Sequence, residues 1–588
     1  MDEGASSSRR RLLAGAGGVA ISALAGCSEA FWSRAENTGP EQVELTIKTV
    51  PADDDPFAAK ILSQLRESCE AAGIDVTHVP SAKADLYREI LLERDYDVFV
   101  ARHPGLDEYD ALYGLLHSQF VTERGWQNPF QFSDPTVDEL LEAQRADGGD
   151  RQESITELVD FLEDTAPYSA IAFPHLVGGA RTDVNAPSPP QQPLEYLDLL
   201  CREPDDGPRD EPLVVGVAGE DLANRLNPIA VDRNRVYGLL GLLYDPLVRR
   251  DRDTGEYIPW LAESVTWTDE DRLQATITLR EGVTWHDGTD LTTDDVDFTV
   301  RFLGDTALGS VDGSIPAPRF RSRQTLVSEV QTIDSRTVTI TFGDTVGDSA
   351  AKPTRDAAVR SLTIPLLPEH VWEPRSEVIA ERQTEALVTD NEEPIGSGLF
   401  RLDEVTADGV ELEPFDEHVF REFPLDRPDA LEGFSQYDGL RFRIDPNVGA
   451  MVDALENGDI DVTASNVPPE RVESIRDGEE TTVISSTTDS FYLLGYNLER
   501  APLVNHRFRQ ILSRLVDREY VVSEFFDGFA EPAMSPRSLL GLADDEHDDG
   551  VRSSIAEFPG TDGEVDDERV RTLFEEASYQ YEDGTLLD

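Results

Sequence analysis

Histidine and serine motifs in the middle of the chain are the first candidates for chemistry. His286 and Asp287 form a pair within a Trp-His-Asp-Gly tract, and His370 follows Glu369. A zinc peptidase needs two histidines at HExxH spacing, which His370 does not have. Residues 396–398 read Gly-Ser-Gly and lack the GxSxG spacing of a serine hydrolase. The sequence therefore predicts no catalytic residue and no metal site, and it favours a protein that is not an enzyme and needs no cofactor.

The segment 276–298 must position the His-Asp pair. It begins with alternating apolar and polar residues, as in a half-buried strand. Gly282 and Gly288 tolerate the positive φ angles of tight turns, and Thr292 precedes Asp295 by three residues, as in a helix-capping box. The segment predicts a strand, a turn and a capped helix, with the histidine as a hydrogen-bonded turn residue.

The charge balance restricts the partners of the chain. Its 588 residues carry 117 Asp and Glu against 51 Lys and Arg, a formal charge of −66, and only four of the cations are lysines. No basic surface is available to neutralise phosphates, which argues against binding nucleic acid. An acidic excess with so little lysine is typical of proteins from salt-rich cells, and we expect a haloarchaeal origin.

The first residues read as an export signal rather than as part of the fold. Residues 8–13, Ser-Arg-Arg-Arg-Leu-Leu, resemble a twin-arginine motif, and residues 24–27, Leu-Ala-Gly-Cys, match a lipoprotein box. We expect residues 1–26 to be removed, Cys27 to carry lipid and residues 27–40 to form a tether. No later segment has the roughly 18 unbroken apolar residues of a membrane helix. The predicted location is the extracellular face of the cell membrane.

Alternating strand and helix patterns follow over residues 41–182 and predict an α/β unit with a largely parallel sheet. Residues 183–211 contain several prolines and an acidic run, and they read as a linker. A second folded unit is expected to begin at residue 212. Cys69 has the spacing of a buried helical residue, while a disulfide between Cys69 and Cys201 stays open.

Motifs after residue 212 define a family resemblance. The segment 276–298 is accompanied by Leu-Tyr-Asp-Pro-Leu-Val at 243–248, Ile-Pro-Leu-Leu-Pro-Glu-His at 364–370 and Pro-Ile-Gly-Ser-Gly-Leu-Phe at 394–400. Together they resemble family 5 solute-binding proteins, the extracytoplasmic peptide, nickel and oligosaccharide receptors of ABC importers. The resemblance implies a two-lobed α/β fold of the periplasmic-binding-protein type, with a hinge between the lobes.

The order of the matching segments is unusual for that family. Residues 572–588 resemble a segment that normally continues into a strand like residues 43–49, and residues from 166 on resemble the usual end of the family. We interpret this order as a circular permutation. Residues 41–182 and 488–588 would then form lobe II, 212–487 would form lobe I, and 183–211 would join the former ends. A separate N-terminal domain fused to a truncated receptor is the alternative.

The resemblance implies a monomeric receptor that captures an oligopeptide-like solute and delivers it to an ABC permease. The loop after residues 96–100 carries an Asp for the peptide amino group in peptide-binding relatives; here Asp107 or Asp110 would take that role only after a shift, and Arg102 would suit an anionic group. Oligosaccharide or metal-chelate binding, or a surface sensory or adhesion role, remain alternatives. Ligand-contacting candidates are Arg102, Asp107, Asp110, Asn227, Tyr237, Phe400 and Asn497.

Overall fold

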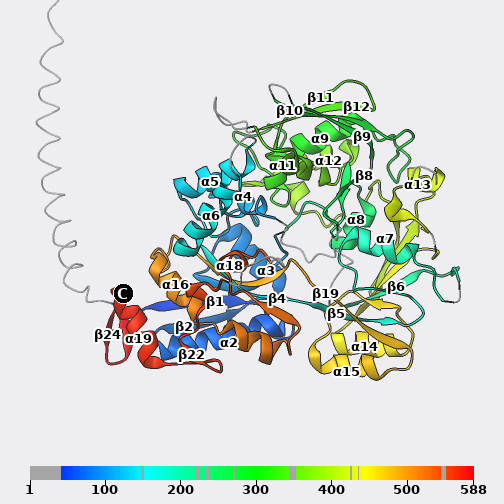
Figure 1. The fold of residues 1–588 in the computed structure, drawn as a ribbon. Coiled ribbons are helices and arrows are strands. Elements are labelled where there is room, and N and C mark those ends of the chain that lie inside the picture. The colour runs from blue at the N-terminus through cyan, green and yellow to red at the C-terminus, as the bar shows by residue number, and fades with distance from the viewer. Residues whose placement is uncertain are drawn as a thin grey trace, which may run out of the picture.

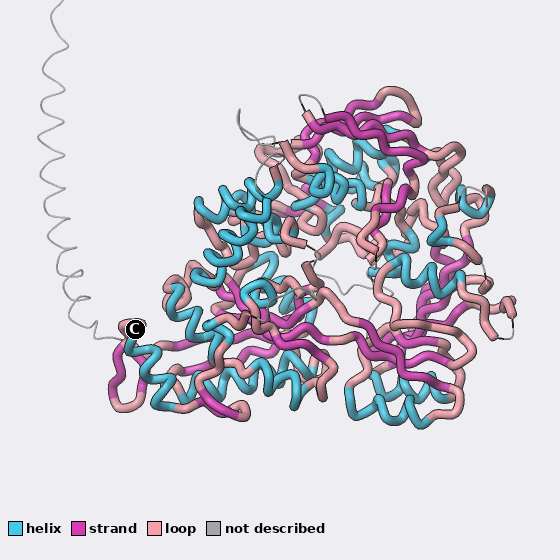
Figure 2. Tube along the Cα trace, in the orientation of Figure 1, coloured by secondary structure: helices cyan, strands magenta, loops and turns pink. Residues whose placement is uncertain are grey.

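The computed structural model describes residues 41–587 except 107, 147–150, 206, 220–225, 232–236, 253, 270–271, 344–351, 424–426, 435 and 544–550. The expected export signal, the tether, Cys27 and Asp107 therefore lie outside the described residues. Within them the chain forms two large sheets with separate cores, joined by two extended segments (Figures 1 and 2). We call the unit around the six-stranded sheet lobe II and the remainder lobe I.

Lobe II is built from both ends of the described chain. Its core combines residues between Val43 and Phe173 with residues between Phe491 and Leu586. The sheet has the order β2 (Asp75–Pro80), β1 (Glu44–Thr49), β3 (Val98–His103), β20 (Phe491–Tyr496), β4 (Tyr168–Pro174) and β21 (Ala530–Pro532). Only β2, β1 and β3 are parallel, whereas β20, β4 and β21 pair antiparallel. The prediction of a largely parallel sheet is therefore wrong, because β20 comes from a distant part of the chain and reverses the strand direction.

Helices cover both faces of this sheet (Figure 1). They include α2 (Pro56–Ala71), α3 (Lys83–Tyr87), α4 (Ala111–Leu116), α5 (Pro135–Arg145), α6 (Arg151–Thr165), α16 (His506–Arg514), α17 (Arg518–Tyr520), α18 (Pro536–Leu539) and α19 (Asp567–Glu576), with π-helical turns η1 (Arg88–Glu93) and η8 (Val521–Phe525) and 3-10 turns η2 (Ser118–Phe120) and η9 (Ser554–Ala556). Helix α2 shows why the sequence folds in this way. Asp55 accepts the backbone N–H groups of Phe57 and Ala58, and Pro56 occupies the first turn.

The two ends of the described chain meet at the outer edge of lobe II (Figure 1). Hairpins β22 (Gly560–Thr561) with β23 (Glu564–Val565) and β24 (Gln580–Glu582) with β25 (Thr585–Leu587) close the C-terminal part. Gln42 forms an antiparallel bridge with Leu587, and the Val43 N–H donates to the Leu586 carbonyl at 2.9 Å. Strand β25 thus lies beside the segment that opens β1.

Lobe I contains a seven-stranded sheet and a four-stranded antiparallel sheet. The larger has the order β15 (Phe400–Thr406), β16 (Gly409–Pro414), β17 (Leu440–Asp445), β6 (Leu213–Ala218), β18 (Val462–Thr463), β5 (Leu176–Arg181) and β19 (Thr481–Ser486). The smaller has the order β11 (Val327–Thr332), β12 (Thr337–Phe342), β10 (Leu273–Leu279) and β9 (Ala262–Asp269). Two hairpins join β7 (Val248–Arg250) to β8 (Tyr257–Pro259) and β13 (Val378–Ala380) to β14 (Gln383–Thr384).

The helices of lobe I are mostly short. They are α7 (Pro193–Cys201), α8 (Tyr237–Leu243), α9 (Thr293–Gly304), α10 (Arg321–Gln324), α11 (Arg355–Val359), α12 (Glu369–Trp372), α13 (Val419–Glu422), α14 (Val448–Glu456) and α15 (Pro469–Asp477), with 3-10 turns η3 (Arg360–Thr363), η4 (Glu373–Ser376), η5 (Glu385–Leu387) and η7 (Asp429–Leu431). Thr292 caps α9 in a capping box with Asp295, as its spacing predicts.

The segment expected to be a linker contributes to the core of lobe I. Helix α7 lies within it, and Tyr196 is buried against α8. A Cβ added at Gly238 would lie 2.0 Å from the Tyr196 ring, and one at Gly241 would lie 2.1 Å from Pro193. The two helices therefore approach as closely as glycine allows. Cys69 and Cys201 are both free thiols, the first in the lobe II core and the second in lobe I.

Candidate functional site

Two extended connections join the lobes at one place. The first passes from β4 to β5 through His175, and the second passes from β19 to β20 through residues 487–490. Thr488 ties them together, because its hydroxyl donates to the Pro174 carbonyl at 2.9 Å. Such paired connections allow two lobes to rotate about a common axis. Sequence analysis placed the first boundary at residue 182, whereas the chain changes sheets at His175.

The strand directions bring the carboxyl ends of the parallel strands toward this connection. In lobe II, His103 at the end of β3 pairs with Phe491 at the start of β20. In lobe I, β6, β17 and β18 run antiparallel to β5, which starts at the connection. Open α/β sheets bind ligands at the carboxyl ends of their strands. The candidate site is therefore the region where the two carboxyl edges face each other.

Arg102 is the sequence-predicted residue that lies at this edge. Its Nε and Nη2 atoms donate to the Ser490 hydroxyl at 3.0 and 2.7 Å. Ser490 in turn lies 2.7 Å from the Thr488 hydroxyl. The guanidinium is half-buried and oriented by the connecting segment. A fixed guanidinium at such an edge can bind a carboxylate through two parallel hydrogen bonds.

Asp55 brings a carboxylate to the same edge. The Tyr492 hydroxyl donates to both of its oxygens, at 3.0 and 3.1 Å, and the N–H groups that begin α2 donate to Oδ1. Burial raises the pKa of Asp55, while the Ala58 N–H and the charge of Arg102 act in the opposite direction. Burial and the Asp55 charge also raise the pKa of Tyr492 well above its usual range. The edge thus presents a carboxylate and a guanidinium to the same region.

His103 completes this edge as a neutral ring. Its Nδ1 accepts the Gly105 N–H at 3.0 Å, and the ring packs against Trp126 and Phe491. Burial lowers the pKa of His103 to about 3. The imidazole therefore acts as a packed acceptor and carries no charge at neutral pH.

Asp110 has partners within the protein. Arg145 donates to its two oxygens at 2.6 and 3.1 Å, and the Arg360 Nη1 of lobe I lies 3.4 Å from Oδ2. Although burial raises the pKa of Asp110, the charges of Arg145 and Arg360 outweigh it and lower the pKa overall. This carboxylate connects the lobes, and its bonding capacity is largely used by the two guanidinium groups.

Three other candidates lie in structural positions. The Asn227 amide donates to the Ala386 and Thr389 carbonyls, Phe400 is buried beside Phe434, and the Asn497 amide donates to the Arg94 and Tyr96 carbonyls. Asn497 follows the end of β20 that is remote from the connection. Tyr237 begins α8, and Asp107 and Cys27 lie outside the described residues. Of the predicted residues that the structure describes, Arg102, Asp110, Asn227, Phe400 and Asn497 do not come together into one site.

The His-Asp and Gly-Ser-Gly motifs meet in the interior of lobe I. His286 Nδ1 accepts the Gly396 N–H at 3.2 Å and its Nε2 lies 3.1 Å from the Gly398 carbonyl. A Cβ at Gly396 or Gly398 would lie 1.9 Å from a backbone carbonyl of α8. Burial lowers the pKa of His286 to about 4. The histidine fixes a close backbone approach, whereas Asp287 is exposed and lies 2.8 Å from His370 Nε2.

A buried ion network lies beside this motif. Asp245 accepts from Arg249 Nη2 at 2.6 Å and lies 3.0 Å from His418 Nε2, while the His418 Nδ1 accepts the Phe420 N–H. Burial raises the pKa of Asp245, but the hydrogen bond from His418 and the charge of Arg249 lower it overall. Asp245 is paired on both oxygens, whereas the buried Arg249 Nε has no hydrogen-bond partner among the described residues.

Sequence reasoning missed Asp55, Ser490 and Tyr492. Asp55 precedes Pro56 at the end of an apolar strand pattern, and this signal for a helix start at a strand's carboxyl end was available. Ser490 and Tyr492 gave no such signal, because their proximity to Arg102 depends on pairing between β3 and β20.

None of the helices in the described ranges is long and apolar enough to cross a membrane. No three histidine, cysteine, aspartate or glutamate side chains in that same part of the chain are arranged to hold a metal ion.

Comparison with known proteins identifies the family of this chain. Residues 256–588 match the model of bacterial extracellular solute-binding proteins, family 5. The chain belongs to this family of binding proteins, which are not enzymes. A binding protein of Brucella melitensis is 25% identical over 437 residues, covering 67% of this chain and 65% of the relative. The oligopeptide-binding protein AppA of Bacillus subtilis is 25% identical over 335 residues, covering 56% and 54%. The chain thus spans less than two thirds of the length of these curated relatives.

Two solved structures of binding proteins are similar to this chain over part of its length. AppA of Bacillus subtilis in complex with a nonapeptide is 19% identical, with 64% of this chain and 66% of that chain covered and a TM-score of 0.42. DppA of Helicobacter pylori in complex with the peptide STSA is 16% identical, with 62% and 65% covered and a TM-score of 0.44.

Proposed function

We propose that this protein is a monomeric, extracytoplasmic receptor that captures a peptide-like solute between its lobes and delivers it to an ABC permease. One observation carries the proposal: the carboxyl edges of two separate sheets face a double connection, where Arg102 and Asp55 lie. The name of the relative AppA, an oligopeptide-binding protein, supports a peptide-like solute.

The two charged groups suggest how such a solute would bind. A peptide has an ammonium group at one end and a carboxylate at the other. Asp55 would accept hydrogen bonds from the ammonium group, and Arg102 would donate to a carboxylate, with Ser490 holding the guanidinium in place. Peptide backbone groups between these ends would pair with exposed strand edges or water.

Thermal unfolding in multimolar salt tests the proposal. The protein is mixed with separate pools of di- and oligopeptides, oligosaccharides and nickel chelates. A solute at 100 times its Kd adds about 2.7 kcal/mol of stability, which raises Tm measurably. We expect a higher Tm with a peptide pool. A Tm shift only with oligosaccharides or with nickel chelates would show that the solute belongs to that class and is not a peptide. No Tm shift with any pool would favour a sensory or adhesion role.

We further propose that Cys27 is lipidated after export through the twin-arginine route and that the protein works in a salt-rich environment. The lipoprotein box and the charge of −66 support this part. Mass spectrometry of the membrane fraction of expressing cells tests it. A diacylglyceryl adduct on a chain beginning at Cys27 is expected, and an unmodified soluble chain would contradict it.

The circular permutation is also a proposal. Two observations support it: β25 pairs with the segment that opens β1, and both chain ends contribute to the core of lobe II. The permutation would give the chain up to β4 and from β20 on to lobe II, while β5 and the segment 183–211, expected to bridge the former ends, would belong to lobe I.

A relinked chain tests the permutation. Residue 588 is joined to residue 41 through two glycines, and the chain is opened between Gly207 and Pro208, where a Cβ on Gly207 would meet no atom within 4 Å. We expect the same circular dichroism spectrum and a Tm within a few degrees, because loop changes of this size cost little free energy. A relinked chain that fails to fold would contradict the proposal.

A further inference from the structure

The lobes touch at a second place, remote from the connecting segments. Helix α4 of lobe II contacts α10 of lobe I, with α5 packed against α4 and η3 against α10. A Cβ at Gly114 of α4 would lie 2.5 Å from the Ser322 hydroxyl of α10. The Thr354 N–H donates to the Arg145 carbonyl at 3.0 Å. We call this region the α4–α10 contact.

Two sets of ion pairs hold the α4–α10 contact together. Arg321 of lobe I binds Glu123 of lobe II through three hydrogen bonds of 2.8 to 3.1 Å. Arg360 of lobe I donates to Glu108 at 2.7 Å and lies 3.4 Å from Asp110. The side chains of Arg360 and Asp110 are only 6% and 4% exposed. Separating the lobes would cost free energy, because Arg360 would lose the carboxylates of Glu108 and Asp110, although Asp110 would keep Arg145.

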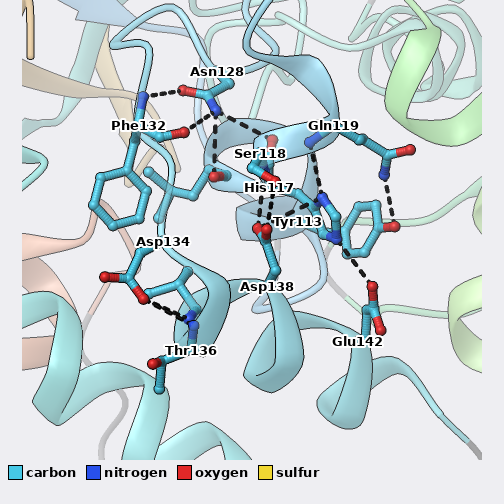
Figure 3. Close-up of polar contacts among 12 residues, drawn as sticks. Tyr113, His117, Ser118, Gln119, Asn128, Phe132, Asp134, Thr136, Asp138 and Glu142 are labelled. Atoms are coloured by element: carbon cyan, nitrogen blue, oxygen red, sulfur yellow. Dashed lines mark hydrogen bonds and ion pairs between the residues drawn. The ribbon is translucent and has the colours of Figure 1, made fainter. Parts of the chain in front are cut away.

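Lobe II holds its half of the contact rigidly. Arg145 stacks on the Tyr113 ring, with Cζ 3.5 Å from the ring centroid, while it binds Asp110. Figure 3 shows the network behind it: His117 lies between Asp138 and Glu142, and the Asn128 amide joins three backbone carbonyls. The acidic side chains that meet lobe I are therefore held on a fixed frame.

A cavity lies between the lobes on another side of the connecting segments. It has a volume of about 530 Å³ and separates α15 of lobe I from α2 and η8 of lobe II. Glu473 and Arg476 line one wall, and Lys60, Phe525 and Phe529 line the other. None of the ion pairs among the described residues crosses it. We call it the α15–η8 cavity.

Rotation about the connecting segments would change these two regions in opposite senses. Separating the carboxyl edges pulls α4 away from α10, while α15 approaches η8. We propose that the α4–α10 contact stabilises the closed arrangement of the lobes and that the α15–η8 cavity is the space that opening consumes. The residues involved would set solute affinity without touching the solute, because closure and binding are coupled. This proposal rests on the hinged receptor proposed above.

Distance measurements between the lobes test it without any solute. Spin labels at Ile333→Cys and Val504→Cys, both exposed and on opposite lobes, report the separation by pulsed electron resonance. Cys27 and Cys201 are replaced by Ser, and buried Cys69 is left. We expect Arg321→Gln with Arg360→Gln to increase the open-to-closed ratio tenfold or more in the full chain. Arg336→Gln, which breaks an exposed pair with Glu263 inside lobe I, is the matched control.

A second variant acts in the opposite direction. Glu473→Trp places a bulky ring in the cavity from an exposed position on α15 and should return the double Arg variant toward the closed distances. Asp477→Trp, which is exposed on α15 but does not line the cavity, should leave the distances unchanged. Charge exchange, Glu123→Arg with Arg321→Glu, should restore the closed population that Arg321→Gln loses.

The outcomes separate this proposal from the proposed function. Unchanged distances in the folded double Arg variant, or no response to Glu473→Trp in that background, would overturn the role of the contact or of the cavity. Distances that shift as expected in a protein that binds none of the solute pools would support the closure mechanism and count against the transport role alone.

Discussion

At the residue scale, buried His103 and half-buried His286 make stability depend on pH. His286 has a pKa of about 4 and His103 of about 3 in the folded protein, below the usual value of 6.5. Because the folded-state pKa of each histidine is lowered, their contribution to the free energy of unfolding is fully present above pH 6.5. This contribution is lost as the pH falls toward 4. His286 alone accounts for about 3 kcal/mol of this loss.

Urea denaturation between pH 7 and pH 4 measures the effect. In His286→Asn the side-chain oxygen still accepts from Gly396, but nothing titrates there. We expect this variant to lose less stability between pH 6.5 and pH 4 than the unmodified protein. Equal losses in both proteins would assign the acid sensitivity to other groups.

Arg102 and Asp55 lead to a binding prediction at the same scale. Arg102→Gln and Asp55→Asn each remove one charge while keeping a similar shape. We expect each to weaken binding of a free peptide about 10- to 100-fold, since hydrogen bonds to charged groups contribute about 1.5–3 kcal/mol. Isothermal titration with peptides blocked at one end assigns the two roles. The affinity for a peptide with a blocked carboxyl end should be the same in Arg102→Gln as in the unmodified protein. Asn497→Ser, remote from the connection, serves as a comparison for indirect effects.

At the scale of elements, the approach of the Gly-Ser-Gly segment to α8 is essential for lobe I. Gly398→Ala places a Cβ 1.9 Å from the Leu242 carbonyl, a backbone atom that cannot move without shifting α8. We expect a loss of about 3 kcal/mol or more, measured as a lower Tm. Gly309→Ala is a useful contrast, because that glycine has open space and its positive φ alone costs about 1 kcal/mol. Similar losses in both variants would contradict the close-approach argument.

The sequence predicts elements better than it predicts contacts between distant elements. The capped start of α9 and the strand β1 follow from local periodicity and capping, and the structure confirms them. Strand β5 and helix α7 were missed, since a glycine-rich strand and a proline-rich segment have weak local signals. The candidate site could not be predicted from local sequence patterns. Arg102 and Ser490 are 388 positions apart, and no local pattern indicates that β3 and β20 pair.

At the scale of the whole molecule, the charge of −66 predicts a strong dependence on salt. In dilute buffer, repulsion among surface carboxylates opposes the compact state, while at 1 M salt the screening length is about 3 Å. We expect Tm to rise by more than 10 °C between 0.1 and 2 M KCl. A variant with ten exposed Glu changed to Gln should show a smaller rise. An increase seen with sulfate but not with chloride would point to burial of apolar surface as the cause.

The position of β20 in the middle of the lobe II sheet has a consequence for synthesis on the ribosome. Its neighbours β3 and β4 emerge early, but they stay without their central partner until most of the chain has been made. Lobe I, by contrast, is continuous and complete before β20 appears. Lobe I should therefore fold first, while the early strands wait with exposed apolar faces and need protection from aggregation.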